Sequence, residues 1–163
     1  MMPVRFSHLC RSLTVLLLLL GVADICRARI GDTLEEAIER YGKPVRKASA
    51  DEFAMFKEAS YYLTAHFHDG KTDAITYVKA GSESSTKGAF SDDEIETLLK
   101  INGSGQTWER SKAKAGLQEW KTEDRKFQAV YSESKFLVIT TAGYVKRLEV
   151  AAKKKKTAVD KDK

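Results

Sequence analysis

Apolar residues at helical spacing mark the start of the folded part of the chain. In "IGDTLEEAIERYGKP", which begins at Ile30, they form one stripe made of Leu34, Ala37, Ile38 and Tyr41. Thr33 and Glu36 stand in the order of a capping box, in which a hydroxyl and a glutamate satisfy free backbone amides of the first turn. Gly42 and Pro44 end the pattern, because glycine accepts a left-handed cap and proline lacks the amide that a helix needs. We predict a short helix that buries one face.

A second helix with the same start is predicted in "SDDEIETLLKING". Ser91 and Glu94 repeat the capping order, and Asn102 and Gly103 supply the stop. The apolar stripe of this helix consists of Ile95, Leu98 and Leu99. The segment before it, "KAGSESSTKGAF", is rich in glycine and serine and is expected to be an exposed link.

Strand-like segments follow each helix, rich in β-branched and aromatic residues and separated by turn residues. After the first helix they are "EFAMF", "YYLTAHF" and "DAITYVK"; after the second they are "LQEWKT", "FQAVY" and "KFLVITT". The chain therefore reads as a helix and three strands given twice, in half-units over about residues 30–79 and 90–141. The residues themselves do not repeat, so the duplication is inferred from element order alone. A short closing helix is predicted from Tyr144, Val145, Leu148 and Ala152.

The turn after "YYLTAHF" decides which side chains face the core. With a three-residue loop from His68 to Gly70, Leu63 lies opposite Ile75 and both face the apolar side. With Asp69 and Gly70 alone in the loop, the pairing shifts by one residue, and Ile75 then faces away from the apolar side. Burial favours the longer loop. The outer face of the hairpin then shows Tyr62, Thr64, His66, Thr76 and Val78.

The first 28 residues have the order of a secretory signal. Arg5 and Arg11 precede an apolar run of about half the roughly 20 residues that span a bilayer, and small residues follow it. Cys26 and Ala28 occupy the positions three and one before a cut, which predicts cleavage after Ala28.

Lipid attachment at Cys26 is the alternative fate of this segment. Cleavage before a lipidated cysteine normally needs a small preceding residue, and Ile25 is not small. We therefore expect an exported periplasmic or extracellular protein, with anchoring at Cys26 the less favoured reading. Both cysteines, Cys10 and Cys26, lie in the predicted signal, so the mature chain has no thiol for disulfides, thiolate metal sites or nucleophilic catalysis.

The remaining length suits a single domain with its own core. Its charge is concentrated at one end: the whole chain has 28 basic and 23 acidic residues, whereas residues 29–150 have 19 and 20. A nearly neutral domain favours no nucleic-acid groove. We predict one domain over residues 29–152 and a disordered lysine-rich tail over 153–163, with weak contact between this tail and anionic surfaces as the alternative.

His66 and His68 are the residues that suggest metal chemistry. Two histidines at positions i and i+2 of a strand share a face, as a metal pair requires. The favoured turn places His68 in the loop, and a third ligand would have to be a carboxylate such as Asp69 or Asp73. We therefore predict no metal and no cofactor.

The stretch "IGDTLEEAIERYGKP", followed by a strand-rich segment and a second capped helix, resembles the small exported proteins of the SmpA/OmlA (BamE-like) and β-lactamase-inhibitor-protein-like group. The resemblance implies helices packed on one face of an antiparallel sheet. It also implies a role in binding other proteins, as a scaffold in outer-membrane assembly or as an inhibitor of secreted enzymes. No catalytic residues are implied, and structural roles fall to Gly31, Thr33, Tyr41, Gly42 and Pro44.

Together these patterns predict an α+β fold, with an antiparallel sheet of about six strands covered on one face by the two capped helices. The predicted core consists of Leu34, Ile38, Tyr41, Leu63, Phe67, Ile75, Ile95, Leu98, Leu99, Phe127, Val138 and Ile139.

The expected function is that of a non-enzymatic protein-binding or scaffolding module of the bacterial cell envelope, whose partner is another envelope or secreted protein. The chain has no glycine-rich phosphate loop, H-E-x-x-H helix or G-x-S-x-G elbow. The partner-binding face would be the uncovered hairpin surface, where aromatic residues supply contact area. One alternative is a small secreted hydrolase, which would use His66 with Asp73 or Glu58; the other is a metal-binding protein.

Overall fold

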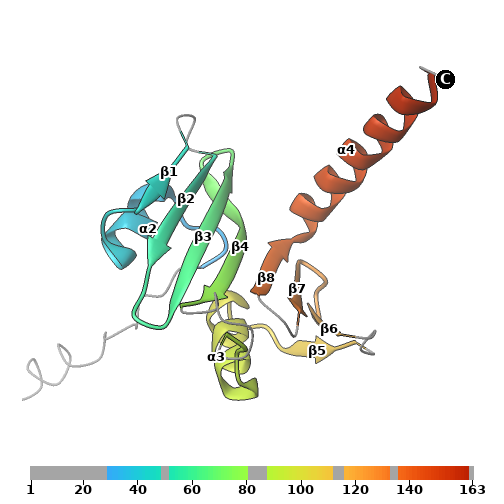
Figure 1. Ribbon diagram of the computed structural model, residues 1–163. Helices are drawn as coiled ribbons and strands as arrows, with labels where there is room; N and C mark the ends of the chain where they lie inside the picture. Colours follow the sequence, from blue (N-terminus) through green and yellow to red (C-terminus); the bar gives the residue numbers. More distant parts are fainter. Residues whose placement is uncertain (1–28, 49–51, 81–87, 112–115, 133–135, 162–163) are drawn as a thin grey trace, which may run out of the picture.

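The computed structural model describes residues 29–48, 52–80, 88–111, 116–132 and 136–161 of the chain (Figure 1). The predicted signal segment and most of the glycine- and serine-rich link lie outside these residues. The described part is an α+β fold with three helices and one antiparallel sheet of eight strands.

Each half of the chain contributes one helix and four strands to the sheet. The first half contains α2 (Leu34–Tyr41), β1 (Arg46–Lys47), β2 (Phe53–Lys57), β3 (Tyr61–His68) and β4 (Lys71–Lys79). The second half contains α3 (Asp92–Asn102), β5 (Trp108–Arg110), β6 (Leu117–Thr122), β7 (Phe127–Ser132) and β8 (Phe136–Thr141). The last element is α4 (Ala142–Lys161).

The two halves meet at the centre of the sheet, where their last strands pair. The strand order is β1-β2-β3-β4-β8-β7-β6-β5, and β4 runs antiparallel to β8 with Ile75 opposite Ile139. In each half, the strands follow one another in chain order from the edge of the sheet to its centre. This shared arrangement supports the repeated helix-and-strand pattern in the sequence. The predicted count of six strands was wrong, because β1 and β5 are short, charged edge strands without an apolar alternation.

Both predicted capping boxes are present. At α2, Glu36 Oε2 accepts from the Thr33 amide at 2.7 Å while the Thr33 hydroxyl accepts from the Glu36 amide at 3.2 Å. At α3, Ser91 and Glu94 make the same pair of bonds at 2.7 and 3.3 Å. Gly42 ends α2, as predicted, but with φ of +76° and ψ of −164° it has an extended positive-φ conformation and not the predicted left-handed cap; its amide donates to the Ile38 carbonyl at 2.8 Å.

One face of the sheet, together with α2 and α3, forms the core. From α2, the Tyr41 ring lies 5.4 Å from that of Phe56 in β2. From α3, Asn102 Nδ2 donates to Tyr77 Oη in β4 at 3.0 Å. The predicted core residues that are buried are Leu34, Leu63, Ile75, Ile95, Leu98, Leu99 and Ile139; those that are partly buried against it are Tyr41, Phe67 and Phe127.

Two members of the predicted core were assigned wrongly. Ile38 is 37% exposed, because the short helix α2 buries only Leu34 and Ala37. Val138 lies opposite Thr76 on the other face of the sheet, since it alternates with the buried Leu137 and Ile139.

The β3–β4 turn differs from the predicted three-residue loop. His68 pairs with Lys71, so the loop contains only Asp69 and Gly70, whose φ values of +50° and +74° are those of a type I′ turn. Leu63 is accordingly opposite Tyr77 and not opposite Ile75.

A β-bulge restores the side-chain parity that the short turn would have reversed. The register shifts between His66, which pairs with Ala74, and Phe67, which pairs with Thr72, so Asp73 is the extra residue. Ile75 therefore faces the core, as the sequence predicted, for a reason that the sequence analysis did not consider.

Helix α4 begins directly after β8 and continues through the lysine-rich segment to Lys161. Residues 153–161 are thus helical where their composition predicted a disordered tail, because alanine and lysine have high helix propensity and lysines near a helix C-terminus interact favourably with its dipole. At the start of the helix, the Thr141 hydroxyl accepts from the Tyr144 amide at 3.0 Å. Figure 1 shows α4 running outward from the body of the domain.

Candidate functional site

The predicted partner-binding residues share one face of β3 and β4, opposite the face that packs on α2 and α3. Tyr62 lies opposite Val78, and Thr64 lies opposite Thr76. All four side chains are partly exposed. The prediction that these four residues share one surface is confirmed, although the turn between their strands differs from the predicted one.

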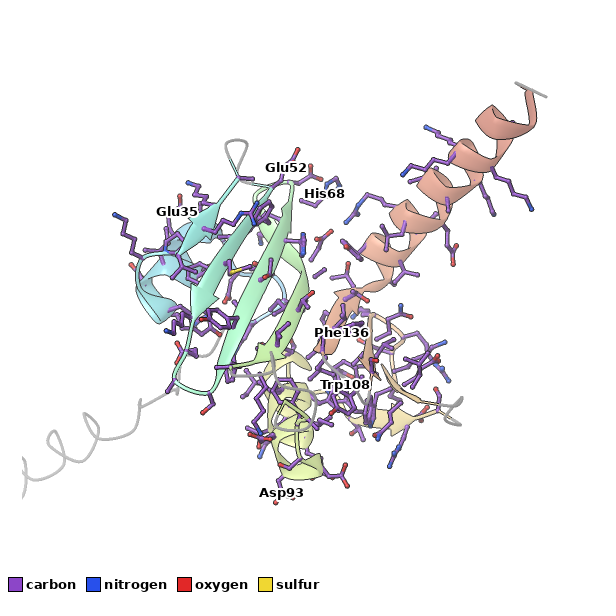
Figure 2. All side chains as sticks on the ribbon, viewed as in Figure 1. Glu35, Glu52, His68, Asp93, Trp108 and Phe136 are labelled. Atoms are coloured by element: carbon purple, nitrogen blue, oxygen red, sulfur yellow. The ribbon has the colours of Figure 1, made fainter. Side chains whose placement is uncertain are left out.

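This surface extends across the centre of the sheet to residues that the sequence analysis missed or placed in the core. Val78 lies opposite Phe136 of β8, and Val138 is paired with both Thr76 and Val130. Phe136 is 39% exposed, and Figure 2 shows it at the start of β8. The alternation in "KFLVITT" was the signal that could have assigned Phe136 and Val138 to this face.

We refer to this surface as the open face. It consists of Met55, Tyr62, Thr64, Thr76, Val78, Val130, Phe136 and Val138. Its members lie on β2, β3, β4, β7 and β8, which are interior strands of the sheet, so their backbone groups are already paired within it. Recognition at the open face would therefore depend on side chains and not on addition of a strand.

His66 belongs to the same strand face but lies beneath α4. Its ring centroid is 6.3 Å from that of Tyr144 in α4 and 6.2 Å from that of Phe53 in β2. Burial lowers the pKa of His66, because the charged imidazolium loses hydration. The sequence predicted that this whole face is uncovered, but the first turns of α4 cover its His66 end.

Asp73 and Arg147 form an ion pair beside this contact. The Asp73 side chain is 13% exposed, whereas that of Arg147 is 41% exposed. The carboxylate that the sequence analysis considered as a partner for His66 is thus engaged by a guanidinium.

The two histidines of the predicted metal pair have different surroundings. His68 is exposed at the end of β3, with Nε2 3.5 Å from Asp69 Oδ2. Among the described residues, no group of three histidine, cysteine or carboxylate side chains is placed to hold a metal ion.

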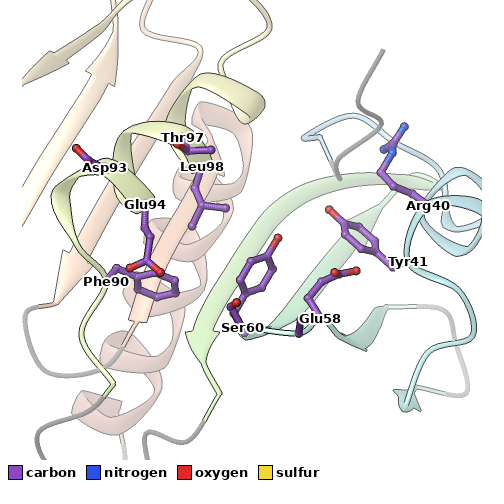
Figure 3. A pocket seen from close by; sticks show the side chains of 11 residues that line it. Arg40, Tyr41, Glu58, Ser60, Phe90, Asp93, Glu94, Thr97 and Leu98 are labelled. Atoms are coloured by element: carbon purple, nitrogen blue, oxygen red, sulfur yellow. The ribbon is translucent and has the colours of Figure 1, made fainter. Parts of the chain in front are cut away.

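A hollow of about 560 Å³ lies between α2 and α3 on the covered side of the sheet (Figure 3). Tyr41, Tyr61 and Phe90 supply rings to its wall, and Glu58 also lines it. Glu58 is thus on the opposite side of the sheet from His66, so the fold does not bring together that candidate catalytic pair.

Glu94, another polar residue of the hollow, has structural partners. Glu94 accepts from Lys79 Nζ at 2.8 Å as well as from the Ser91 amide at 2.7 Å. The hydrogen bond from Lys79, with that from the Ser91 amide, lowers the pKa of the Glu94 carboxyl. These bonds hold α3 on the sheet, and they engage the Glu94 carboxylate.

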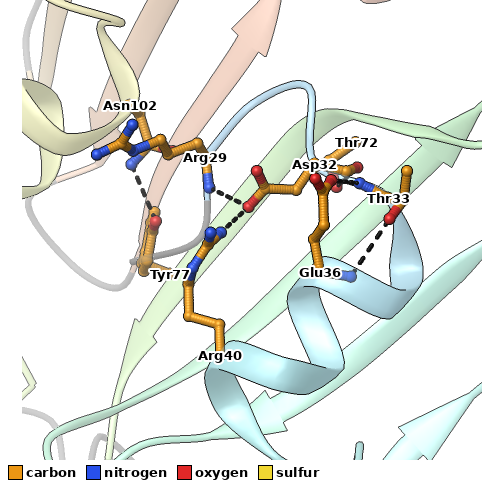
Figure 4. A network of polar contacts seen from close by, with 8 residues as sticks. All are labelled: Arg29, Asp32, Thr33, Glu36, Arg40, Thr72, Tyr77 and Asn102. Atoms are coloured by element: carbon orange, nitrogen blue, oxygen red, sulfur yellow. Dashed lines mark hydrogen bonds and ion pairs between the residues drawn. The ribbon is translucent and has the colours of Figure 1, made fainter. Parts of the chain in front are cut away.

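Arg40, also in the wall of the hollow, belongs to a polar network before α2 (Figure 4). Asp32 forms an ion pair with Arg40 and accepts from the Arg29 amide at 2.9 Å. The Thr72 hydroxyl donates to the Asp32 carbonyl at 2.9 Å. This network ties the segment before α2 to the start of β4, next to the bulge.

Comparisons of the chain with protein-family models, curated proteins and solved structures find no match. The resemblance to the SmpA/OmlA and β-lactamase-inhibitor-protein-like group stays a prediction. Within the described ranges, each helix is too short or too polar to cross a membrane.

Proposed function

We propose that this protein is an exported, non-enzymatic module of the bacterial cell envelope that binds another envelope or secreted protein through its open face. The observation that carries the proposal is the gathering of partly exposed aromatic, aliphatic and threonine side chains on central strands, on the side that α2 and α3 leave uncovered. Antiparallel sheets often leave one face toward solvent, and that face is then usually polar. Here apolar side chains occupy the central strands of the face, while charged residues such as Lys57, opposite Tyr62, lie beside them, and a surface of this kind is a candidate contact surface.

The composition of the open face suits protein recognition. Tyr62 and Phe136 supply large rings that lose little conformational entropy when they are fixed in a complex. Lys57 Nζ lies 5.9 Å from the centre of the Tyr62 ring, so a cation borders this contact surface. The threonines present short side chains that let a partner approach the sheet closely.

The sheet also holds these side chains in fixed positions. Tyr62, Val78 and Phe136 stand in one row across three hydrogen-bonded strands, and the bulge and α4 close one end of the surface. A preorganised surface loses less free energy on binding than a mobile loop does.

The alternative functions have weaker support. A hydrolase would need His66 near Glu58 or a free Asp73, but these groups lie on opposite faces or in an ion pair. A metal-binding protein would need a third ligand near the two histidines. Of the two candidates, Asp69 lies beside the exposed His68, and Asp73 forms an ion pair with Arg147.

Site-specific photo-crosslinking in the native envelope tests this function. A photoreactive amino acid is placed at Tyr62, at Phe136 or, as the control, at Ile38, which is similarly exposed on α2. We expect the same protein adduct from positions 62 and 136 and none from 38. An adduct from position 38 alone, or none from any position, would reject the open face as the contact surface.

Two further measurements separate the alternatives. Turnover of a substrate that is abolished by His66→Ala would favour the hydrolase. The mass of the exported form tests the location: we propose a chain that begins at Arg29, and a form that begins at an acylated Cys26 would show membrane anchoring instead.

A further inference from the structure

Helix α4 differs in charge from the rest of the domain. Its 20 residues include seven lysines or arginines and two acidic residues, a net charge of +5. Residues 29–141 include 17 basic and 19 acidic residues, a net charge of −2. The positive charge of the protein is therefore concentrated on one helix, where it can act on a partner at short range.

After its first two turns, the part of this helix whose side chains the structure describes is exposed. Tyr144 and Arg147, in its first two turns, reach the sheet through His66 and Asp73. From Leu148 to Thr157 every residue is exposed, and Figure 1 shows the helix running away from the sheet. The four consecutive lysines, 153–156, are on this projecting part.

The exposed part of α4 has an apolar side that continues from the part packed on the sheet. Residues three or four positions apart share one side of a helix, so Tyr144, Leu148, Ala151 and Ala152 are neighbours. Tyr144 packs on the sheet, whereas Leu148 is 54% exposed. Lys155 lies two turns after Leu148 on the same side of the helix. Its aliphatic stem can lie along an apolar boundary while its charged group stays in water.

The basic residues lie mainly on another side of α4. Lys146 and Lys153 are two turns apart, as are Arg147 and Lys154, so each pair is nearly aligned along the helix. Three of these side chains line one shallow hollow along α4, together with Val150. An exposed helix with a basic side and an apolar side is typical of binding to a membrane surface.

We propose that α4 binds the surface of a membrane rich in anionic phospholipid, with its lysines at the headgroup phosphates and Leu148 at the acyl boundary. The proposal does not depend on the identity of the partner of the open face. Phosphate groups complement the charge of α4, and the apolar side gives a membrane an advantage over a nucleic acid, which would leave Leu148 in water. The ion pair between Arg147 and Asp73 would fix the orientation of the domain relative to the bound helix.

Vesicle flotation with the proposed exported form, residues 29–163, tests the proposal, because this form lacks the apolar run of the predicted signal. The probes are vesicles of phosphatidylglycerol and phosphatidylcholine, compared with vesicles of phosphatidylcholine alone. Each lysine near an anionic surface contributes about a fivefold increase in partitioning, so changing the four consecutive lysines to glutamine should reduce binding by roughly two to three orders of magnitude at about 0.1 M salt. Glutamine keeps the helix propensity of lysine, which circular dichroism can verify.

A matched control changes the same net charge elsewhere. It replaces four exposed lysines of the body with glutamine: Lys43, Lys47, Lys71 and Lys100. We expect this variant to bind within about twofold of the unchanged protein, because charges beyond a Debye length of roughly 10 Å are screened at 0.1 M salt. Equal losses in the two variants would overturn the proposal, because binding would then follow net charge alone.

Leu148→Ser distinguishes a membrane from other polyanions. We expect it to weaken vesicle binding about tenfold, since it removes most of a buried leucine's apolar contribution. Full binding by this variant, together with displacement from vesicles by duplex DNA at equal phosphate concentration, would identify α4 as a general polyanion site and would overturn the proposal. Equal binding to phosphatidylcholine alone would also overturn it.

Discussion

Asp73, the extra residue of the β-bulge in β4, forms an ion pair with Arg147 of α4. The same irregularity therefore restores the inward-facing parity of β4 and fixes the start of the C-terminal helix. The bulge changes the direction of the Asp73 side chain, and the Asp73 carboxylate can then pair with the guanidinium of Arg147 in α4. The sheet and α4 are thus coupled through one backbone feature.

Breaking this ion pair from the Arg147 side should destabilise the protein. Arg147→Ala leaves the mostly buried Asp73 carboxylate without its cation, and we expect a loss of about 1–2 kcal/mol in urea unfolding, below the range for fully buried pairs because Arg147 is partly exposed. Asp73→Asn should cost less, since the remaining guanidinium can turn to water. Equal costs for the two variants would contradict this account of the contact.

Stability should depend on pH through His66. Its pKa is lower in the folded state than in the unfolded state, because burial against Phe53 and Tyr144 disfavours the charged ring. As the pH falls below about 6.5, the unfolded chain binds the proton first, so the free energy of unfolding should decrease until the pH passes the folded-state pKa.

Urea unfolding at about pH 7.5 and pH 5 measures this effect. His66→Phe should reduce the loss of stability on acidification. His68→Asn, which changes the exposed histidine of the same strand, serves as the control and should leave it in place. A His66→Phe variant with the full loss would show that other groups control this range of pH.

Adjacent residues of β8 should differ sharply in their effect on stability. Ile139 is fully buried in the core, opposite Ile75 of β4, so Ile139→Ala should cost about 2–4 kcal/mol through lost contacts and a cavity. Val138→Ala, on the open face, should cost less than about 1 kcal/mol. Thermal or urea unfolding of both variants decides whether the two residues lie on different faces, and similar costs would argue against it.

Gly103 should be intolerant of a side chain for a steric reason. A Cβ at this position would lie 2.5 Å from Trp108 Nε1, which donates to the Leu99 carbonyl at 2.8 Å. Gly103→Ala should displace the indole, change the tryptophan fluorescence and cost about 1–3 kcal/mol.

Gly105→Ala is the comparison for this effect. Gly105 has φ of +80° but open space where a Cβ would lie, so its substitution should strain the backbone without moving Trp108. A fluorescence change in this variant equal to that of Gly103→Ala would point to a general loosening of the turn instead.

The local signals in the sequence were sufficient for the helices and most of the strands. The capping boxes at Thr33 and Ser91 involve residues only three positions apart, so their geometry follows from the chain itself. Alternation likewise identified the six long strands and the shared face of Tyr62, Thr64 and Val78. Because Leu63 and Ile75 must be buried on one side of the hairpin, these three residues must lie on the other side, whichever turn connects the two strands.

The binding surface as a whole could not be derived in this way. Phe136 and Val138 join Tyr62 and Val78 only because β8 pairs with β4, and this pairing joins strands more than 50 residues apart in the chain. The sequence could not show which strands of the two halves would be neighbours. It also gave no sign that α4 would cover His66.

What the sequence determined by itself was therefore each pattern that spans a few residues: the helix caps, the apolar stripes, the six strands and the separation of core from surface. Tertiary structure decided the rest. The charged strands β1 and β5 form because a neighbouring strand offers its free hydrogen-bonding edge. The bulge at Asp73 reconciles a two-residue turn with the burial of Ile75, and this compromise arises only when the turn, the core and α4 are present together.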